Sequence, residues 1–222
     1  MAVTIKPLEE NEISTFVRIE LEAFRPHPRT AMMWPRGYTD DLYAFYEANK
    51  LKSFHDPTAH FMKAMDDQTG QVAAVSEWTF ALDPVVNANK PRTDPNGQPP
   101  ANWPVAGNWA LRRFFKIEFE KFLHDVLGGK PYILLDILCV EPKFQGRGAG
   151  SQLLKWGTEQ ADARGIHMCL ESTPDGLTLY TRFGFVQRRI IDADMKEFGY
   201  NDPYSETAAV RYWMVREPRV EQ

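Results

Sequence analysis

The chain has 222 residues, of which 43% are hydrophobic and 25% are charged, proportions typical of a folded globular domain. Its formal net charge of -4 leaves no excess of Lys and Arg to neutralise a phosphate backbone, which argues against nucleic acid as a partner. No run approaches the roughly 20 apolar residues that cross a bilayer, and the N-terminus has no apolar signal segment. These features predict one cytoplasmic domain over residues 1–222, with no membrane partner.

The first half of the chain alternates between strand-like and helix-like patterns. In chain order, the spacing of apolar residues predicts a strand over 3–6, a helix over 9–24, a proline-rich loop over 25–36, a helix over 38–51, and strands over 59–65 and 72–82 joined by a polar turn. Six prolines then fall between Pro84 and Pro104. Because proline fixes φ and removes a backbone donor, we expect an insertion in the single domain at about 83–107.

The second half continues the alternation. The pattern predicts a helix over 109–127 ending at Gly128, a buried strand over 132–140, a helix over about 148–164, a strand over 167–171, a short helix over 177–182, and strands over 185–191 and 210–215. Strands and helices interleave, so the expected fold class is α/β (α+β) with a mixed sheet.

Cysteine and histidine usage gives no sign of a disulfide or a metal. Cys139 and Cys169 lie in apolar, strand-like runs, so each is expected to be a small buried side chain. The five histidines show no spacing with Cys or carboxylates that is typical of a metal site, and no metal is expected. Cys139 also lacks a recognisable histidine partner, which argues against a nucleophilic role.

The most informative segment follows the buried strand over 132–140. Three alternate glycines, Gly146, Gly148 and Gly150, open a helix there, and no carboxylate occurs between Gly146 and Thr158. Small residues let the backbone approach a ligand, and the first N–H groups of a helix have no internal partner. The helix dipole adds a partial positive charge at the same end. This pattern predicts a binding site for a phosphate-bearing ligand.

Two familiar phosphate loops fit this segment poorly. A P-loop needs Lys and then Ser or Thr after its last glycine, whereas Gly150 is followed by Ser151 and Gln152. A dinucleotide fingerprint finds Gly146, Gly148 and a downstream acid at Glu171, but its third glycine falls on Ser151. A NAD-binding oxidoreductase is therefore kept only as a minor alternative.

The motif Gln145-x-x-Gly148-x-Gly150, after a strand ending Leu138-Cys-Val-x-Pro, resembles the acyl-coenzyme A signature of the GNAT superfamily of N-acetyltransferases. A second segment, Leu179-Tyr180-Thr-Arg-Phe-Gly184-Phe185, is similar to the Leu-Tyr-x-x-x-Gly-Phe segment of that family. The resemblance implies a mostly antiparallel sheet of six to seven strands flanked by helices on both faces. It also implies transfer of an acetyl group from acetyl-CoA to a primary amine by direct attack in a ternary complex. A non-catalytic acyl-CoA sensor of the same fold is the alternative.

The resemblance also implies where the coenzyme is held. Its pyrophosphate would be bound by the backbone amides of Gln145, Gly146, Arg147, Gly148, Ala149, Gly150 and Ser151. The pantetheine arm would pair with Leu138, Cys139 and Val140 as an additional strand does. An amide near Cys139 or Val140 would polarise the thioester carbonyl.

Three residues are candidates for proton transfer. Tyr180 occupies the family's tyrosine position and is the candidate general acid, since a phenol stays protonated at neutral pH. Asp136 is the only residue in the strand over 132–140 that is ordinarily charged at neutral pH, and simple alternation puts it on one face with Leu134 and Leu138. It is either the general base or half of a structural ion pair. Glu77 is a second candidate base or a solvated strand residue.

The acceptor pocket is expected to come from the irregular segments 26–46 and 85–109, because loops on a fixed scaffold carry specificity. Candidates for its lining are Trp34, Tyr38, Trp103 and Trp109. The expected acceptor is a small-molecule amine, although a protein acceptor stays open. The oligomeric state is also left open, with a homodimer as one option.

Overall fold

A computed structural model describes residues 2–205 and 209–219, and within them seven strands form one sheet in the order β1-β2-β3-β4-β5-β7-β6. The strands are β1 (Val3–Pro7), β2 (Ala59–Asp66), β3 (Val72–Ala81), β4 (Tyr132–Val140), β5 (His167–Ser172), β6 (Val186–Asp192) and β7 (Val210–Arg216). β4 and β5 run parallel, and the other neighbouring pairs are antiparallel. The predicted fold class and the mostly antiparallel mixed sheet are confirmed.

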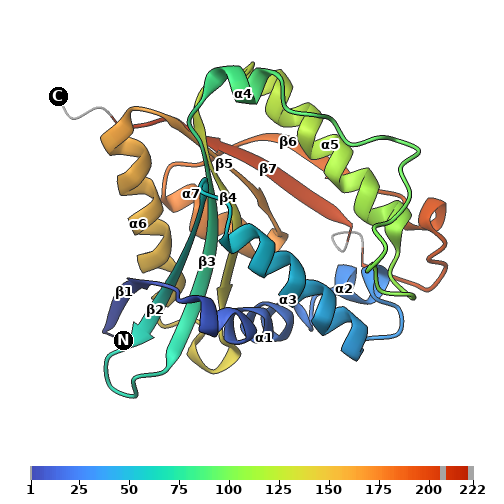
Figure 1. Ribbon diagram of the computed structural model, residues 1–222, viewed down its shortest axis with the longest axis horizontal. Coiled ribbons are helices and arrows are strands. Elements are labelled where there is room, and N and C mark those ends of the chain that lie inside the picture. Colours follow the sequence, from blue (N-terminus) through green and yellow to red (C-terminus); the bar gives the residue numbers. More distant parts are fainter. Residues whose placement is uncertain (1, 206–208, 220–222) are drawn as a thin grey trace.

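Helices cover both faces of this sheet. They are α1 (Ile13–Phe24), α2 (Pro28–Met33), α3 (Asp40–Phe54), α4 (Pro84–Ala88), α5 (Trp109–Leu127), α6 (Ala149–Arg164) and α7 (Leu177–Arg182). α6 lies on one side of the central strands, and α1, α3 and α5 lie on the other (Figure 1). Among the described residues, no helix combines the length and apolar character that a membrane crossing requires.

α6 approaches the sheet closely because it carries a glycine at the contact. A Cβ atom on Gly157 would lie 2.2 Å from the ring of Trp78, which is fully buried on β3. Leu153 and Leu154 of the same helix are also fully buried in this core. The glycine and the apolar stripe together fix the helix, and with it the glycine-rich loop at its start, against β3 and β4.

The segment 25–36 differs from its prediction, because it contains the helix α2 rather than only a loop. Pro28 stands in the first turn of that helix, where the missing N–H removes no hydrogen bond. The His27 side chain caps the turn by accepting a hydrogen bond from the Arg29 amide at 3.2 Å. The prolines therefore begin a helix here, and α2 supplies residues to the site described below.

β4 contains a bulge that changes which side chains share a face. The register between β3 and β4 shifts beside Glu77, and Asp136 is the extra residue on β4. A bulge places one more side chain on the same face and reverses the alternation after it. The predicted common face of Leu134, Asp136 and Leu138 is therefore wrong for Leu138, which packs into the core on the α6 side, whereas Asp136 and Leu134 face the opposite side.

Candidate active site

The glycine-rich loop has the geometry of an anion cradle. Gly146 and Gly148 adopt positive φ angles of 72° and 93°, which other residues rarely adopt. Gly148 is also the N-cap of α6 without any side-chain cap, and the first turn holds no acidic residue. A Cβ atom on Gly150 would lie 3.1 Å from the Val140 side chain, so the loop packs directly on the end of β4.

The strand edge next to this loop is open. β4 and β5 pair only over their first four residues, from Tyr132 with His167 to Leu135 with Leu170. Beyond that point Leu138, Cys139 and Val140 pair with β3 alone among the described residues. The two parallel strands therefore diverge, and the backbone of these three residues faces the gap. An extended ligand can add to such an edge as a strand does.

Tyr180 lies near this gap, at the end of α7. Its side chain is 9% exposed and packs at 5.9 Å from Phe185, ring centre to ring centre. Burial raises the pKa of Tyr180, and the nearby Cys139 side chain raises it further. The phenol therefore stays protonated at neutral pH, and its neighbour Cys139 places it beside the open edge of β4. The Cys139 pKa is itself raised well above the usual value by burial, which leaves the thiol unsuited to nucleophilic attack.

A cavity of about 560 Å³ opens on the other face of the sheet, between β3, β4, α1, α2, α3 and α5. Its lining is rich in aromatic side chains: Phe24, Trp34, Tyr38, Phe45, Tyr46, Trp103 and Phe119. Three of the four predicted lining residues are therefore in the lining. Trp109 lies behind it, with its ring 5.0 Å from Trp103 and its Nε1 donating to the Gly97 carbonyl.

Asp136 projects into this cavity from the bulge of β4. It is exposed to solvent in the cavity lining, and Thr79 Oγ1 donates a 2.7 Å hydrogen bond to its carboxylate. Burial, reinforced by the negative charge of Glu77, raises the pKa of Asp136 to about 7. A carboxylate with such a pKa is half ionised at neutral pH and suited to accept a proton.

Glu77 belongs to a buried charge cluster rather than to a solvated strand face. It is 6% exposed and accepts hydrogen bonds from Lys50 Nζ and Ser53 Oγ, each at 2.5 Å. Lys50 Nζ also lies 3.2 Å from Glu20. Burial opposes the charge on Lys50, but the two glutamates outweigh it and raise the Lys50 pKa. The alternative of a solvated Glu77 is wrong, and the cluster sits next to Asp136.

A second buried charge cluster lies on the β5 and β7 side of the cavity. The Glu171 carboxylate is 2.9 Å from Arg29 Nη1 and 3.2 Å from Arg211 Nε, and it accepts a hydrogen bond from Trp213 Nε1. Burial opposes ionisation of Glu171, yet the two guanidinium groups outweigh it and lower its pKa. Glu171 is the downstream acid on which the alternative of a dinucleotide-binding fingerprint depended. In the structure it pairs with two arginines in this cavity.

Sequence reasoning missed the partners in both clusters: Glu20, Lys50, Arg29 and Arg211. Glu20 carried a usable signal, because it falls within the apolar stripe of α1, where an acid needs a buried partner. The other three gave none, since their partners lie far away along the chain.

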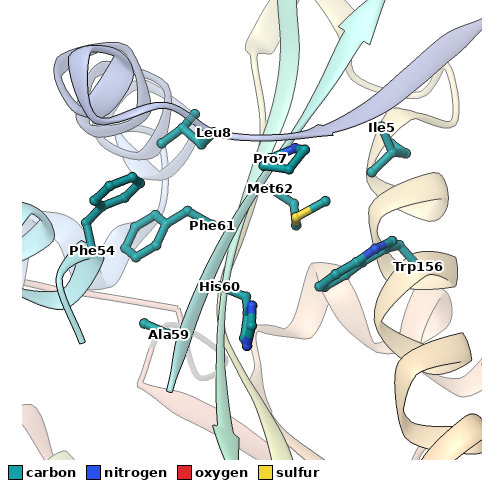
Figure 2. Close-up of a pocket in the computed structure, with 9 residues that line it drawn as sticks. All are labelled: Ile5, Pro7, Leu8, Phe54, Ala59, His60, Phe61, Met62 and Trp156. Carbon is teal, nitrogen blue, oxygen red and sulfur yellow. The ribbon is translucent and has the colours of Figure 1, made fainter. Parts of the chain in front are cut away.

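A second hollow, of about 530 Å³, lies at the β1 edge of the sheet (Figure 2). Phe54, Phe61 and Leu8 gather on one side of β2, and His60 and Trp156 lie on the other. His60 is the one ionisable group in its lining, and burial lowers its pKa. Without a second ionisable group in its lining, this hollow offers no paired acid–base chemistry. Within the described residues, no group of three or more His, Cys, Asp or Glu is placed to hold a metal.

Comparisons with known proteins agree with this geometry. Residues 114–187 match the family model of the acetyltransferase (GNAT) domain, which spans the open strand, the glycine-rich loop and Tyr180. No curated protein matches the sequence.

Several solved structures share the fold of the chain. A putative arylalkylamine N-acetyltransferase 7 from the yellow fever mosquito is 15% identical with a TM-score of 0.70, covering 97% of this chain and 87% of that one. The Drosophila melanogaster polyamine N-acetyltransferase is 15% identical with a TM-score of 0.64, covering 97% and 100%. A Corynebacterium glutamicum protein described as histone acetyltransferase HPA2 and related acetyltransferase is 20% identical with a TM-score of 0.61, covering 100% and 99%. The family model and these folds confirm the predicted GNAT resemblance.

Proposed function

We propose that this chain, whose residues 114–187 match the acetyltransferase (GNAT) domain model, transfers an acetyl group from acetyl-CoA to the primary amine of a small molecule. One observation carries the proposal: a carboxylate with a pKa of about 7, Asp136, faces a cavity rich in aromatic side chains beside the open edge of β4. Proteins of similar fold that are named for arylalkylamine and polyamine acceptors support a small amine as the acceptor.

The residues around the gap fit acetyl-CoA. The amides from Gln145 to Ser151 would hold its pyrophosphate, because Gly146 and Gly148 leave the backbone bare and α6 begins without a side-chain cap. Leu138, Cys139 and Val140 would hold the pantetheine arm along the unpaired edge of β4. When bound, acetyl-CoA supplies the thioester whose acetyl group is transferred.

Two side chains would handle the protons. A protonated amine has no lone pair, so Asp136 would accept its proton from the cavity side, directly or through one water. Glu77 would act on Asp136 by its charge, because Lys50 and Ser53 already occupy its carboxylate. Tyr180, kept protonated by burial, would donate to the departing thiolate. The amide of Cys139 or Val140 would donate to the thioester carbonyl oxygen.

The proposal is tested by thiol release from acetyl-CoA over a panel of arylalkylamines, polyamines and short peptides with free N-termini. We expect turnover with at least one class of small amine. Binding of acetyl-CoA without thiol release for any amine would favour the sensor alternative. Turnover of the peptides alone would contradict the small-molecule acceptor and leave acetyl transfer standing.

Tyr180→Phe is expected to lower kcat by about 100-fold, since general acid catalysis contributes on the order of 10² to 10⁴. The ring packing on Phe185 is retained, so the Kd for coenzyme A measured by calorimetry should stay near the wild-type value. Tyr200→Phe is the matched control, because Tyr200 does not line the cavity. An unchanged kcat in Tyr180→Phe would remove Tyr180 from the acid role.

Gly148→Ala is expected to weaken coenzyme A binding by about tenfold. A Cβ at a φ of 93° costs about 1–2 kcal/mol of backbone strain, which shifts the amides of the loop. Gly165→Ala is the matched control, because Gly165 has a φ of 62° at the opposite end of the same helix. Equal Kd values for the two variants would show that the loop does not hold the coenzyme.

A further inference from the structure

The acceptor cavity carries opposite net charges on the two sides of the gap between β4 and β5. On the β3 and β4 side, Lys50 lies between two acids, 3.2 Å from Glu20 and 2.5 Å from Glu77. Asp136 adds a third acid there, and the exposed Arg112, which acts on Glu20, is a second base, so three acids face two bases on this side. Although Lys50 Nζ is close, Glu20 Oε2 accepts no hydrogen bond from the described residues. This side therefore favours a cation that brings additional N–H donors.

On the β5 and β7 side the arrangement is reversed, because one acid lies between two bases. Glu171 pairs with Arg29 and Arg211, whose side chains are only 13% and 4% exposed. Arg29 is further fixed by Phe115, whose ring centre lies 4.1 Å from the guanidinium carbon. One carboxylate cannot balance two guanidinium groups, so this side keeps one unit of positive charge with little water to screen it.

Neighbouring groups do not cancel that charge. His27 lines the same side, and burial together with the two arginines lowers its pKa to about 4, so it is neutral at pH 7. Asp175 acts on His27 but is exposed and outside the cavity lining. Arg29 uses only Nη1 in its bond to Glu171, and its other N–H groups donate to no described residue. They remain available to an anion that enters the cavity.

We infer that the acceptor is an amine that also carries a carboxylate, bound with its ammonium group toward Glu77 and Asp136 and its carboxylate on Arg29 and Arg211. The aromatic side chains of the lining supply contacts for the part of the acceptor between its two charged ends. The arginine fork matches the planar geometry of a carboxylate. A carboxylate also balances the single excess positive charge, whereas a phosphate ester would bring about two negative charges.

This inference rests on the proposed acetyl transfer, and a matched pair of acceptors tests the two separately. The pair is 4-(aminomethyl)benzoate and 4-methylbenzylamine, which share the amine and the ring and differ in the carboxylate. Initial rates of thiol release from acetyl-CoA give kcat/KM for each. We expect a preference of about 10- to 100-fold for the benzoate, the size of one charge-assisted hydrogen bond.

Variants of the arginine locate the preference in the structure. In Arg29→Ala the ratio of the two kcat/KM values should fall toward one. In Arg29→Lys the ratio should lie between those of the wild type and Arg29→Ala, because lysine keeps the charge and loses the planar fork. The ratio compares two acceptors on one preparation, so partial unfolding cancels. Arg36→Ala, at an exposed arginine outside the cavity lining, is the control and should keep the wild-type ratio.

Two results would overturn the inference while leaving acetyl transfer intact: equal or better turnover of 4-methylbenzylamine, or an unchanged ratio in both Arg29 variants. Absence of thiol release with either acceptor and with the wider amine panel, while coenzyme A still binds, would contradict the proposed function itself.

Discussion

Asp136→Asn is expected to lower kcat/KM for the amine by about 10² to 10⁴-fold, the usual contribution of a general base. An amide of nearly the same shape keeps the contact with Thr79 but cannot accept the proton. In the wild type, the pKa of about 7 predicts a rate that falls as pH drops below 7, because the ionised form of Asp136 is lost. The measurement is a profile of kcat/KM between pH 5 and 9 for both proteins.

A stability measurement on Asp136→Asn distinguishes loss of the base from loss of the folded structure. The pKa of Asp136 is raised in the folded state from an ordinary value of 3.8, so the wild type loses stability as pH rises from about 4 to about 7. The asparagine variant does not undergo this loss. The Tm of the variant minus the Tm of the wild type should therefore be more positive at pH 8 than at pH 4. Asp192→Asn, at an exposed position on β6, is the control for both measurements. A variant that is folded and fully active would remove Asp136 from the base role.

Lys50→Met is expected to lower the free energy of unfolding by about 3–5 kcal/mol at pH 8. The substitution leaves Glu20 and Glu77 buried without their common cation, and an unpaired buried charge costs about this much. The loss should shrink at pH 5.5, because Glu20, whose pKa burial already raises, takes up a proton in the folded state. Urea denaturation at the two pH values measures the difference.

Two further variants make this result specific. Lys50→Met combined with Glu77→Gln removes one of the two acids and should recover part of the lost stability. Lys52→Met, on the exposed face of the same helix α3, should change it little. A deficit of the same size at both pH values, or no recovery in the double variant, would mean that the methionine disturbs packing rather than charge pairing.

The glycine-rich loop and the helix after it were predictable because their signals are local. Gly146 and Gly148 are required by the positive φ angles of the turn itself, and the absence of acids in the first turn of α6 is visible in the sequence. The apolar run of β4 and the glycine cap of α6 at Gly165 are likewise signalled by residues that lie close together in the sequence. These features also carried the family resemblance, which the GNAT domain match confirms.

The proposed acceptor cavity was only partly predictable. Trp34 and Trp103 were expected in its lining, and both are there. The helix over 28–33 was missed because its prolines suggested a loop, whereas proline is tolerated in the first turn of a helix. The face of Asp136 relative to Leu138 was also wrong, since a β-bulge depends on how two strands pair and leaves no periodic signal in either strand.

By itself the sequence determined most of the strands and helices, the glycine-rich loop and the candidate acid and base, because each depends on neighbours within a few positions. Only the tertiary structure decided the charge pattern of the proposed acceptor cavity. Glu171 meets Arg29 across 142 positions of the chain, and Lys50 meets Glu77 across 27. Electrostatic pairing depends on distance in space and on exclusion of water, and both are settled only when the sheet and its helices pack together.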